Sequence, residues 1–155
     1  MGTDVAFEAI DPDEPDAQHC LRAYYAVLDE RFDEGFDVEA ALPLPLDELR
    51  PPLGTFLIAR LDGSAVACGG IKFHGDEPAE LKRMWVDASV RGRGLGRRML
   101  VALEDAARAG GATAVQLETN RNLPEAISMY RTSGYEEVEA FNDEPYGHHW
   151  FQKDL

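Results

Sequence analysis

The sequence predicts a mixed α/β domain built around one central sheet. Short runs of alternating apolar residues indicate strands, whereas other segments repeat apolar residues at three- and four-residue steps and indicate helices. The two kinds of segment are interspersed along the chain, which is typical of a sheet flanked by helices. Because 155 residues match the size of one domain, we expect residues 1–155 to form a single domain.

The first third of the chain predicts a strand, a helix and an irregular connection. Residues 5–10 alternate as a strand does, and the acidic, proline-containing segment 11–15 is suited to the start of a helix. One apolar face continues to about Phe32, where we expect the helix to end. Four prolines interrupt residues 36–54, so this segment is predicted to be a loop with one short helical turn.

The middle of the chain predicts an antiparallel meander. Residues 55–61 and 65–73 form a predicted hairpin, because Asp62-Gly63 between them suits the positive φ angles of a tight turn. Residues 79–86 supply a third strand after the Gly-Asp-Glu-Pro segment.

Helices and strands alternate after the meander. One helix is predicted from Leu95 to the Gly110-Gly111 pair, and another from Pro124, which favours a first helical turn, to Thr132. The remaining strand-like runs bring the sheet to about six or seven strands; they are residues 114–119, 135–141 and 149–153.

The composition argues against several classes of protein. With 29 acidic and 15 basic residues the net charge is −14, so we expect neither a nucleic-acid nor a membrane partner. The acidic N-terminus lacks the features of a signal peptide and no apolar run is long enough to cross a bilayer, so we expect a cytoplasmic protein. Cys20 and Cys68 lie within apolar patterns, which favours buried free thiols over a disulfide.

A glycine- and arginine-rich stretch, V-R-G-R-G-L-G-R-R, lies between the third strand of the meander and the next helix. Glycines allow the backbone to approach a ligand closely, and the N-terminus of the helix favours an anion there. The stretch lacks the lysine and hydroxyl of a P-loop, and its Gly-x-Gly-x-Gly spacing differs from the dinucleotide fingerprint. A tight turn with solvated arginines is the alternative to a phosphate site. The arginines concerned are Arg91, Arg93, Arg97 and Arg98.

The chain resembles the GNAT superfamily of N-acetyltransferases. The signature of its acetyl-coenzyme A loop, [RQ]-x-x-G-x-[GA], is matched by Arg91, Gly94 and Gly96, and P-E-A-I-S-M-Y-R-T-S-G-Y is similar to the family's second cofactor segment. The similarity extends from about Phe56 to Val138. It implies a mostly antiparallel sheet whose fourth and fifth strands splay apart, so that acetyl-coenzyme A lies between them like an added strand.

The resemblance also implies how acetyl-coenzyme A is bound as a cosubstrate, without a metal. The loop backbone would receive the pyrophosphate, and the end of the fourth strand would pair along the pantetheine arm. The implied cofactor-binding residues are Met84, Trp85, Val86, Arg91, Gly92, Arg93, Gly94, Leu95, Gly96, Arg97 and Asn122. Asn122 is out of register, because the family commonly has Asn or Gln seven residues before the tyrosine of the second segment and this sequence has Leu123 there.

Acetyl transfer to an amine requires a base and an acid. The resemblance implies Tyr130 as the acid for the departing thiolate, and either Glu80 or a water as the base. Three alternatives follow from the residues themselves: Glu80 pairs with Lys82 on one face of its strand, Glu118 on the next strand is the base, or Tyr130 is a core residue. The adjacent His148 and His149 would point to opposite faces of a strand, so no metal site is predicted.

We expect an enzyme that transfers the acetyl group of acetyl-coenzyme A to a primary amine of a small molecule by direct attack in a ternary complex. A protein or peptide N-acetyltransferase and a non-catalytic acyl-coenzyme A-binding regulatory domain are the alternatives. Homodimers are common in the family, and the C-terminal strands offer a surface for pairing. Acidic residues near the end of the first helix would attract a cationic acceptor; they are Asp29, Glu30, Asp33, Glu34, Asp37 and Glu39.

Overall fold

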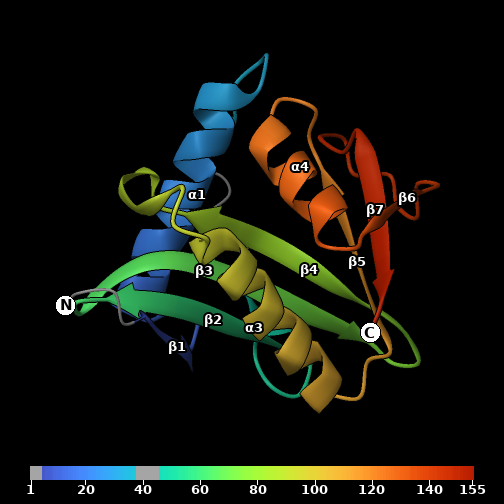
Figure 1. The fold of residues 1–155 in the computed structure, drawn as a ribbon, viewed down its shortest axis with the longest axis horizontal. Helices are drawn as coiled ribbons and strands as arrows, with labels where there is room; N and C mark the ends of the chain where they lie inside the picture. Colours follow the sequence, from blue (N-terminus) through green and yellow to red (C-terminus); the bar gives the residue numbers. More distant parts are fainter. Residues whose placement is uncertain (1–4, 38–45) are drawn as a thin grey trace.

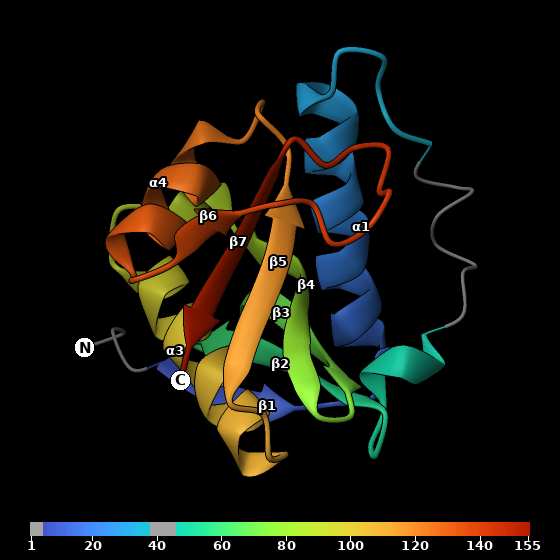
Figure 2. The ribbon, with the colours of Figure 1, turned by 90° about the vertical axis from the view of Figure 1, so that its right-hand side faces the viewer.

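The computed structural model describes residues 5–37 and 46–155. They form one seven-stranded sheet in the order β1-β2-β3-β4-β5-β7-β6, with helices on both faces (Figures 1 and 2). Neighbouring strands are antiparallel except β4 and β5, which are parallel. The predicted fold class, a mixed and mostly antiparallel sheet flanked by helices, is therefore confirmed.

The elements follow the predicted order. Their bounds are β1 (Val5–Ala9), α1 (Pro15–Arg31), the 3₁₀ turn η1 (Asp47–Leu49), β2 (Gly54–Leu61), β3 (Ser64–His74), β4 (Glu77–Val86), the 3₁₀ turn η2 (Ala88–Val90), α3 (Leu95–Ala109), β5 (Ala114–Thr119), α4 (Pro124–Thr132), β6 (Glu136–Val138) and β7 (His149–Asp154).

Local sequence explains where most elements begin and end. Pro15 and Pro124 occupy the first turns of α1 and α4, where a missing N–H costs no hydrogen bond. Asp62 and Gly63 have φ angles of 52° and 84°, as the hairpin turn between β2 and β3 requires. The helical turn predicted in the proline-rich segment is η1, although residues 38–45 of that segment lie outside the described ranges.

The sheet is covered on both faces by apolar side chains. On one face α1 contributes Leu21, which packs in a core with Ile58, Trp85 and Cys68. On the other face α3 and α4 cover a second core that includes Leu103 (Figure 2). Cys20 and Cys68 are both fully buried and neither forms a disulfide, as predicted.

The sheet opens between β4 and β5. These strands pair only at Ala79 with Val115 and at Glu80 with Gln116, although β4 continues to Val86 and β5 to Thr119. Figure 1 shows the two strands diverging beyond this pairing, with α4 beside the opening. The splay that the resemblance implied is present, and it leaves backbone groups of β4 without a partner on β5.

The predicted strand over residues 135–141 is shorter in the structure. Only residues 136–138 pair with β7, because the chain then turns away from the sheet. Asn142 holds this turn: its Oδ1 accepts hydrogen bonds from Trp150 Nε1 at 3.0 Å and from the Glu144 N–H at 3.2 Å.

Among the described helices, none has the length and apolarity needed to cross a bilayer.

Candidate active site

Two cavities meet where the sheet splays. The larger, of about 470 Å³, lies between α1, β5 and the β6–β7 connection, and the smaller, of about 390 Å³, lies between α1, the glycine-rich loop and α4. They have six lining residues in common, which are Tyr24, Leu28, Met84, Leu123, Ala126 and Tyr130. We call them the acceptor cavity and the loop cavity.

The loop cavity contains most of the residues predicted to bind a cofactor. Those that line it are Met84, Trp85, Val86, Arg91, Gly92, Gly94, Leu95, Gly96 and Arg97. Gly92 and Gly94 have φ angles of 81° and 74°, a region that favours glycine, and no atom of the described residues, chain neighbours aside, lies within 4 Å of where a Cβ would be. The backbone of the loop is therefore open to a ligand, and the N-terminus of α3 faces the same cavity.

The arginines of the glycine-rich stretch do not all serve this cavity. Arg97 lines it and also bonds the end of α4, through the Thr132 side chain and Ser133 Oγ. Arg91 lines it with its Nε 3.4 Å from the Val86 carbonyl oxygen. In contrast, Arg98 stacks over the Phe7 ring at 5.4 Å.

Two of the predicted cofactor residues do not line the loop cavity. Arg93 is exposed on the loop and is absent from the cavity wall. Asn122 also lies outside both cavity walls, and its side-chain amide donates to the Arg31 carbonyl at 2.9 Å and to Asp33 Oδ1 at 3.1 Å. The amide of Asn122 thus fastens the start of α4 to the end of α1.

Tyr130 lies at the junction of the two cavities. Its side chain comes from α4, is 5% exposed, and packs against the rings of Tyr135 and Phe151. The phenol oxygen lies 3.9 Å from Met84 Sδ on β4. Burial raises the pKa of this phenol, and the nearby charge of Glu118 raises it further, so that the hydroxyl keeps its proton at neutral pH.

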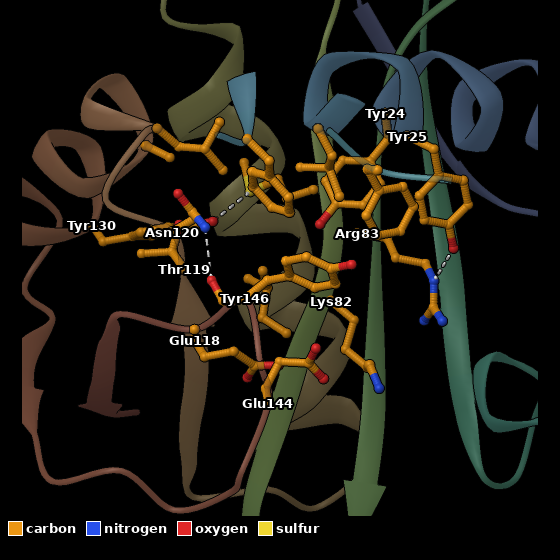
Figure 3. Close-up of a pocket in the computed structure, with 18 of the residues that line it drawn as sticks. Tyr24, Tyr25, Lys82, Arg83, Glu118, Thr119, Asn120, Tyr130, Glu144 and Tyr146 are labelled. Atoms are coloured by element: carbon orange, nitrogen blue, oxygen red, sulfur yellow. Dashed lines mark hydrogen bonds between the residues drawn. The ribbon is translucent and has the colours of Figure 1, made fainter. Parts of the chain in front are cut away.

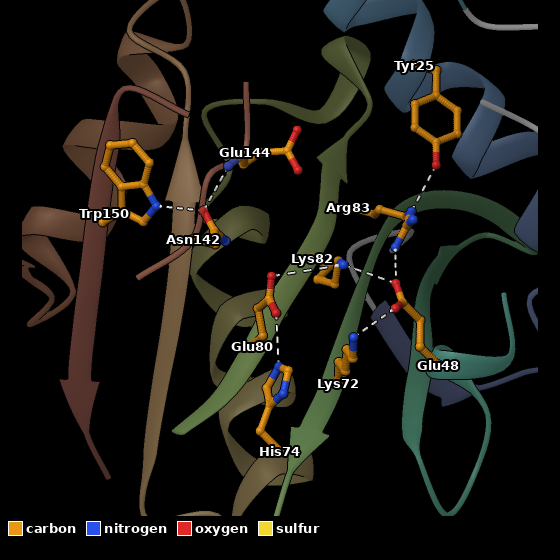
Figure 4. Close-up of polar contacts among 10 residues, drawn as sticks. All are labelled: Tyr25, Glu48, Lys72, His74, Glu80, Lys82, Arg83, Asn142, Glu144 and Trp150. Atoms are coloured by element: carbon orange, nitrogen blue, oxygen red, sulfur yellow. Dashed lines mark hydrogen bonds and ion pairs between the residues drawn. The ribbon is translucent and has the colours of Figure 1, made fainter. Parts of the chain in front are cut away.

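Glu80 is buried but lies outside both cavity walls. Its Oε1 is 3.0 Å from His74 Nε2, and its Oε2 is 3.9 Å from Lys82 Nζ (Figure 4). The carboxylate thus takes part in polar contacts at the closed end of the β4–β5 pairing. These contacts include the pairing with Lys82 considered above as the alternative to a role as base.

Glu118 places its carboxyl group in the acceptor cavity (Figure 3). Its Oε2 atom is buried and has no hydrogen-bond partner among the described residues. Burial raises the pKa of this carboxyl and the charge of Glu80 raises it further, while a hydrogen bond with Asn142 acts in the opposite direction. A buried carboxyl with a raised pKa and a free oxygen is suited to accept a proton.

The sequence patterns miss much of the acceptor cavity. Tyr24 and Tyr25 follow the apolar period of α1 and so indicate only core positions, yet both line the cavity. Glu144 and Tyr146 come from the connection before β7, which has no sequence signal for a site. Tyr146 stacks on Phe32 with ring centroids 4.9 Å apart, and this contact brings the connection to α1.

Two of the acidic residues near the end of α1 make contacts within the protein. Asp29 accepts a hydrogen bond from the Phe36 N–H at 2.8 Å, and Asp33 pairs with Arg121 at 3.1 Å. Asp37 lines the acceptor cavity, and Glu39 lies outside the described residues.

The two C-terminal histidines contact different partners. His148 Nδ1 accepts a hydrogen bond from the Arg121 N–H at 3.1 Å, whereas His149 Nδ1 lies 2.8 Å from Glu137 Oε2. Within residues 5–37 and 46–155, no group of three or more His, Cys, Asp or Glu side chains is arranged to hold a metal ion.

Comparison with known proteins identifies similar sequences. A sequence model of the acetyltransferase (GNAT) family matches residues 16–135. An "IAA acetyltransferase" of Azospirillum brasilense is 37% identical over 121 residues, which cover 77% of this chain and 78% of that protein. An "N-alpha-acetyltransferase RimI" of Mycobacterium tuberculosis is 36% identical over 94 residues, covering 59% of this chain and 58% of that protein.

Solved structures share the fold over nearly the whole chain. A crystal structure from Klebsiella pneumoniae, described as an acyl-CoA N-acyltransferase, superimposes with a TM-score of 0.77 at 29% identity and covers 97% of both chains. The PaiA N-acetyltransferase of Thermoplasma acidophilum, solved in complex with coenzyme A, gives a TM-score of 0.79 at 15% identity, covering 99% of this chain and 100% of that one. At that low identity the likeness concerns the fold alone.

Proposed function

Because this chain belongs to the acetyltransferase (GNAT) family and is an N-acetyltransferase, we propose that it transfers an acetyl group from acetyl-coenzyme A to the primary amine of a small molecule. The observation that carries the proposal is the junction of the two cavities at Tyr130, with the unpartnered carboxyl oxygen of Glu118 on the acceptor side. An acid and a base thus flank the place where the two substrates would meet.

The loop cavity fits the phosphate and pantetheine parts of acetyl-coenzyme A. Gly92 and Gly94 leave the loop backbone uncovered, and Arg91 and Arg97 add positive charge in a chain that is otherwise strongly acidic. The splayed end of β4 has free backbone groups that an extended ligand can pair with. When bound, acetyl-coenzyme A supplies an acetyl group activated as a thioester.

An ion pair offsets the negative charge of a glutamate that lines the loop cavity. Glu125 lines this cavity at the start of α4, where its carboxylate would repel phosphate. Arg31 of α1 pairs with it, with Nη2 3.2 Å from Oε1, and lines the same cavity. Arg31 thus neutralises the nearest acid and holds α1 against α4 beside the cofactor.

We assign the base to Glu118 rather than to Glu80. Glu118 lines the acceptor cavity and has an oxygen without a hydrogen-bond partner among the described residues. Glu80 lies outside the cavity wall and contacts His74 and Lys82. In this assignment the attacking amine gives its proton to Glu118, directly or through a water. Tyr130, whose phenol stays protonated, supplies a proton to the sulfur that leaves.

The RimI relative favours a second candidate, transfer to the N-terminal amine of a protein. The same base and acid would serve that reaction. The two candidates differ in what surrounds the amine: a peptide bond in one case, and the rest of a small molecule in the other.

The proposal is tested by following thiol release from acetyl-coenzyme A in the presence of amino acids, alkylamines, aromatic amines and short peptides. A calorimetric titration with acetyl-coenzyme A is run on the same preparation. We expect micromolar-range binding and release that depends on one class of amine. Tight binding without release for any amine would contradict the proposed reaction, and absence of binding would contradict the assignment of the loop cavity.

A further inference from the structure

We propose that the acceptor is an α-amino acid with an apolar or aromatic side chain, and that Arg83 binds its carboxylate. This inference rests on the proposed function and names the substrate class of the same site. It follows from the shape of β4 beside the acceptor cavity, from the hydrogen bonds of Arg83, and from the distribution of charges and rings around the cavity.

A β-bulge brings Arg83 into the cavity wall. On β3, Gly70 pairs with Lys82 and Cys68 pairs with Trp85, so that Arg83 and Met84 together face the single residue Gly69. Arg83 has a φ of 55°, in the left-handed region that is uncommon for a side chain of this size. Side chains of a regular strand alternate between faces, yet the four consecutive residues 81–84 all line the acceptor cavity.

Packing on β3 holds the bulge in place. A Cβ at Gly69 would lie 2.5 Å from Leu103 Cδ1, so α3 packs closely on β3 here and a side chain at this position would displace Leu103. Cys68 Sγ lies 3.3 Å from the Arg83 carbonyl oxygen, which accepts its hydrogen bond. The bulge therefore places the Arg83 side chain next to Met84, the residue that contacts the Tyr130 phenol.

The guanidinium of Arg83 has donors left over. Its Nε donates to the Tyr25 hydroxyl at 2.8 Å and its Nη1 donates to Glu48 Oε1 at 3.2 Å (Figure 4). Its Nη2 makes no hydrogen bond to any described residue, although the side chain is only 14% exposed. Because arginine keeps its charge in proteins, the unpaired N–H groups of Nη2 favour an anionic partner.

The β4 wall of the cavity carries more positive than negative charge. Lys72, Lys82 and Arg83 all pair with the one carboxylate of Glu48, at 3.0–3.2 Å. Burial opposes ionisation of Glu48, but the hydrogen bond and charge of Lys82, followed by Lys72 and Arg83, lower its pKa to about 2. Glu80 is a second carboxylate, 3.9 Å from Lys82. Of the three cations only Lys82 and Arg83 line the cavity, whereas neither of the two carboxylates does.

The opposite wall is acidic, so the cavity has a negatively charged side and a positively charged side. Figure 3 shows Glu118 and Glu144 on one side of the cavity, and Lys82 and Arg83 on the other. An acceptor with an amine near Glu118 and a carboxylate near Arg83 complements both walls. A molecule with several positive charges would place one of them against Lys82 and Arg83, which disfavours a polyamine.

Aromatic rings form the outer wall, where the rest of the acceptor would lie. Phe36 stacks on Tyr25 with centroids 5.4 Å apart, and Tyr146 lies 5.4 Å from Phe36 and 4.9 Å from Phe32. Such rings offer apolar surface and few hydrogen-bond partners. They favour a hydrocarbon or aromatic side chain over a polar one.

The experiment compares acceptors that differ only at the carboxylate. One set is L-phenylalanine, L-phenylalaninamide and 2-phenylethylamine, and a second is L-leucine, L-leucinamide and isoamylamine. We expect kcat/KM for each amino acid to exceed that of its amide and its amine by about 10- to 100-fold, the range for a charged hydrogen bond lost from a buried site. The same ratios are measured for Arg83→Gln and Arg83→Lys, and for Lys72→Gln as the control.

Arg83→Gln is expected to lower the ratio of amino acid to amine at least about tenfold, and Arg83→Lys to give an intermediate value, because lysine offers a charge without the planar pair of donors. Lys72 also pairs with Glu48 but does not line the cavity. Lys72→Gln removes this cation and should leave the ratio within about twofold of the wild type. Circular dichroism of each variant checks that the fold is retained.

The possible results separate this inference from the proposed function. Equal or higher kcat/KM for the amides and amines would overturn the inference alone, and a preference for the amides would favour a peptide N-terminus. If acetyl-coenzyme A binds but none of the amines gives thiol release, both the inference and the proposed function are overturned. A carboxylate preference that survives in Arg83→Gln would remove Arg83 as its cause.

Discussion

The Oε2 atom of Glu118 is buried and has no partner among the described residues, which makes the ionised form of this side chain costly in the folded protein. Burial, with the charge of Glu80 as the second cause, raises its pKa. A group with a raised pKa in the folded state contributes stability that is present below its unfolded pKa and lost as the pH rises through the folded value. Above the folded pKa, therefore, Glu118 lowers stability while it is available as a base.

Glu118→Gln is expected to lower kcat about 100-fold or more, because the amide cannot accept the amine proton. The same change should raise the free energy of unfolding at pH 8, where it replaces a buried carboxylate by a neutral group, but not at pH 4, where both side chains are uncharged. Rates across pH and urea unfolding at the two pH values measure these effects. An unchanged kcat would remove Glu118 as the base.

Glu80→Gln gives the matched comparison between the two candidate bases. Because the charge of Glu80 raises the pKa of Glu118, its removal should move the acidic limb of the kcat/KM profile to lower pH. The maximum rate should stay within about fivefold of the wild type, since the carboxylate of Glu80 lies outside the acceptor cavity. A larger loss without a shift of the limb would instead support Glu80 as the base.

Tyr130→Phe keeps the ring that packs against Tyr135 and Phe151 and removes only the hydroxyl. The raised pKa, caused first by burial and then by Glu118, keeps the wild-type phenol protonated, so the variant lacks a proton for the leaving sulfur. We expect kcat to fall about 100-fold with little change in the affinity for acetyl-coenzyme A. Tyr24→Phe alters the other tyrosine shared by both cavities; an equal loss there would argue against Tyr130 as the acid.

At the scale of single elements, the glycine-rich loop combines a left-handed backbone, which favours glycine, with an uncovered surface. Gly94 caps α3 with a φ of 74°, and Gly75 in the turn between β3 and β4 has a φ of 65°. Apart from the chain neighbours, no atom in the described part of the chain lies within 4 Å of a Cβ built at either residue. A side chain at either position is therefore strained by similar amounts, but only at Gly94 would it enter the loop cavity.

Gly94→Val and Gly75→Val should each lower the free energy of unfolding by about 1–2 kcal/mol, the cost of a left-handed residue with a side chain. Only Gly94→Val should weaken acetyl-coenzyme A binding, by tenfold or more, because the side chain would cover the exposed loop backbone. Thermal unfolding and calorimetric titration measure the two effects. Equal affinities in the two variants would show that the loop does not hold the ligand.

Individual elements differ in how far the sequence predicts them. The hairpin at Asp62-Gly63 and the helix at Pro124 follow from local turn and capping chemistry, and the structure has both. The bulge at Arg83 lies opposite Gly69, where α3 packs closely on β3 through Leu103, and this contact leaves no pattern in the sequence of β4. The expected alternation of β4 side chains between the two faces of the sheet therefore fails at residues 81–84, which line the acceptor cavity.

For the molecule as a whole, the family signature locates the loop cavity but not the acceptor cavity. Arg91, Gly94 and Gly96 are close in the sequence and carry a spacing that can be recognised. Tyr24 and Tyr146 are brought together across the sheet only by the packing of α1 and of the connection before β7. Long-range packing of this kind also puts Glu118, the weaker candidate from the sequence, in the wall of the acceptor cavity.

The same splay that creates the site divides the sheet into two parts, β1–β4 and β5-β7-β6, with only two residue pairs between them. A buried ion pair helps to join the second part to α3, which packs on the first. Glu104 of α3 is 3% exposed; its Oε2 accepts a hydrogen bond from the Tyr135 hydroxyl at 2.9 Å and lies 3.2 Å from Lys153 Nζ on β7. Stability of the whole domain should therefore depend on this contact.

Lys153→Met should lower the free energy of unfolding by about 1–3 kcal/mol, because it leaves the charge of Glu104 buried with only the hydroxyl of Tyr135 as a partner. Adding Glu104→Gln removes that charge and keeps an acceptor for the hydroxyl, so the double variant should recover most of the loss. Arg108→Met breaks the exposed pair with Asp105 on the same helix and should cost less than about 0.5 kcal/mol. Urea unfolding of the wild type and the three variants measures these free energies. Equal losses for Lys153→Met and Arg108→Met, or no recovery in the double variant, would show that the two parts are held together by their apolar cores alone.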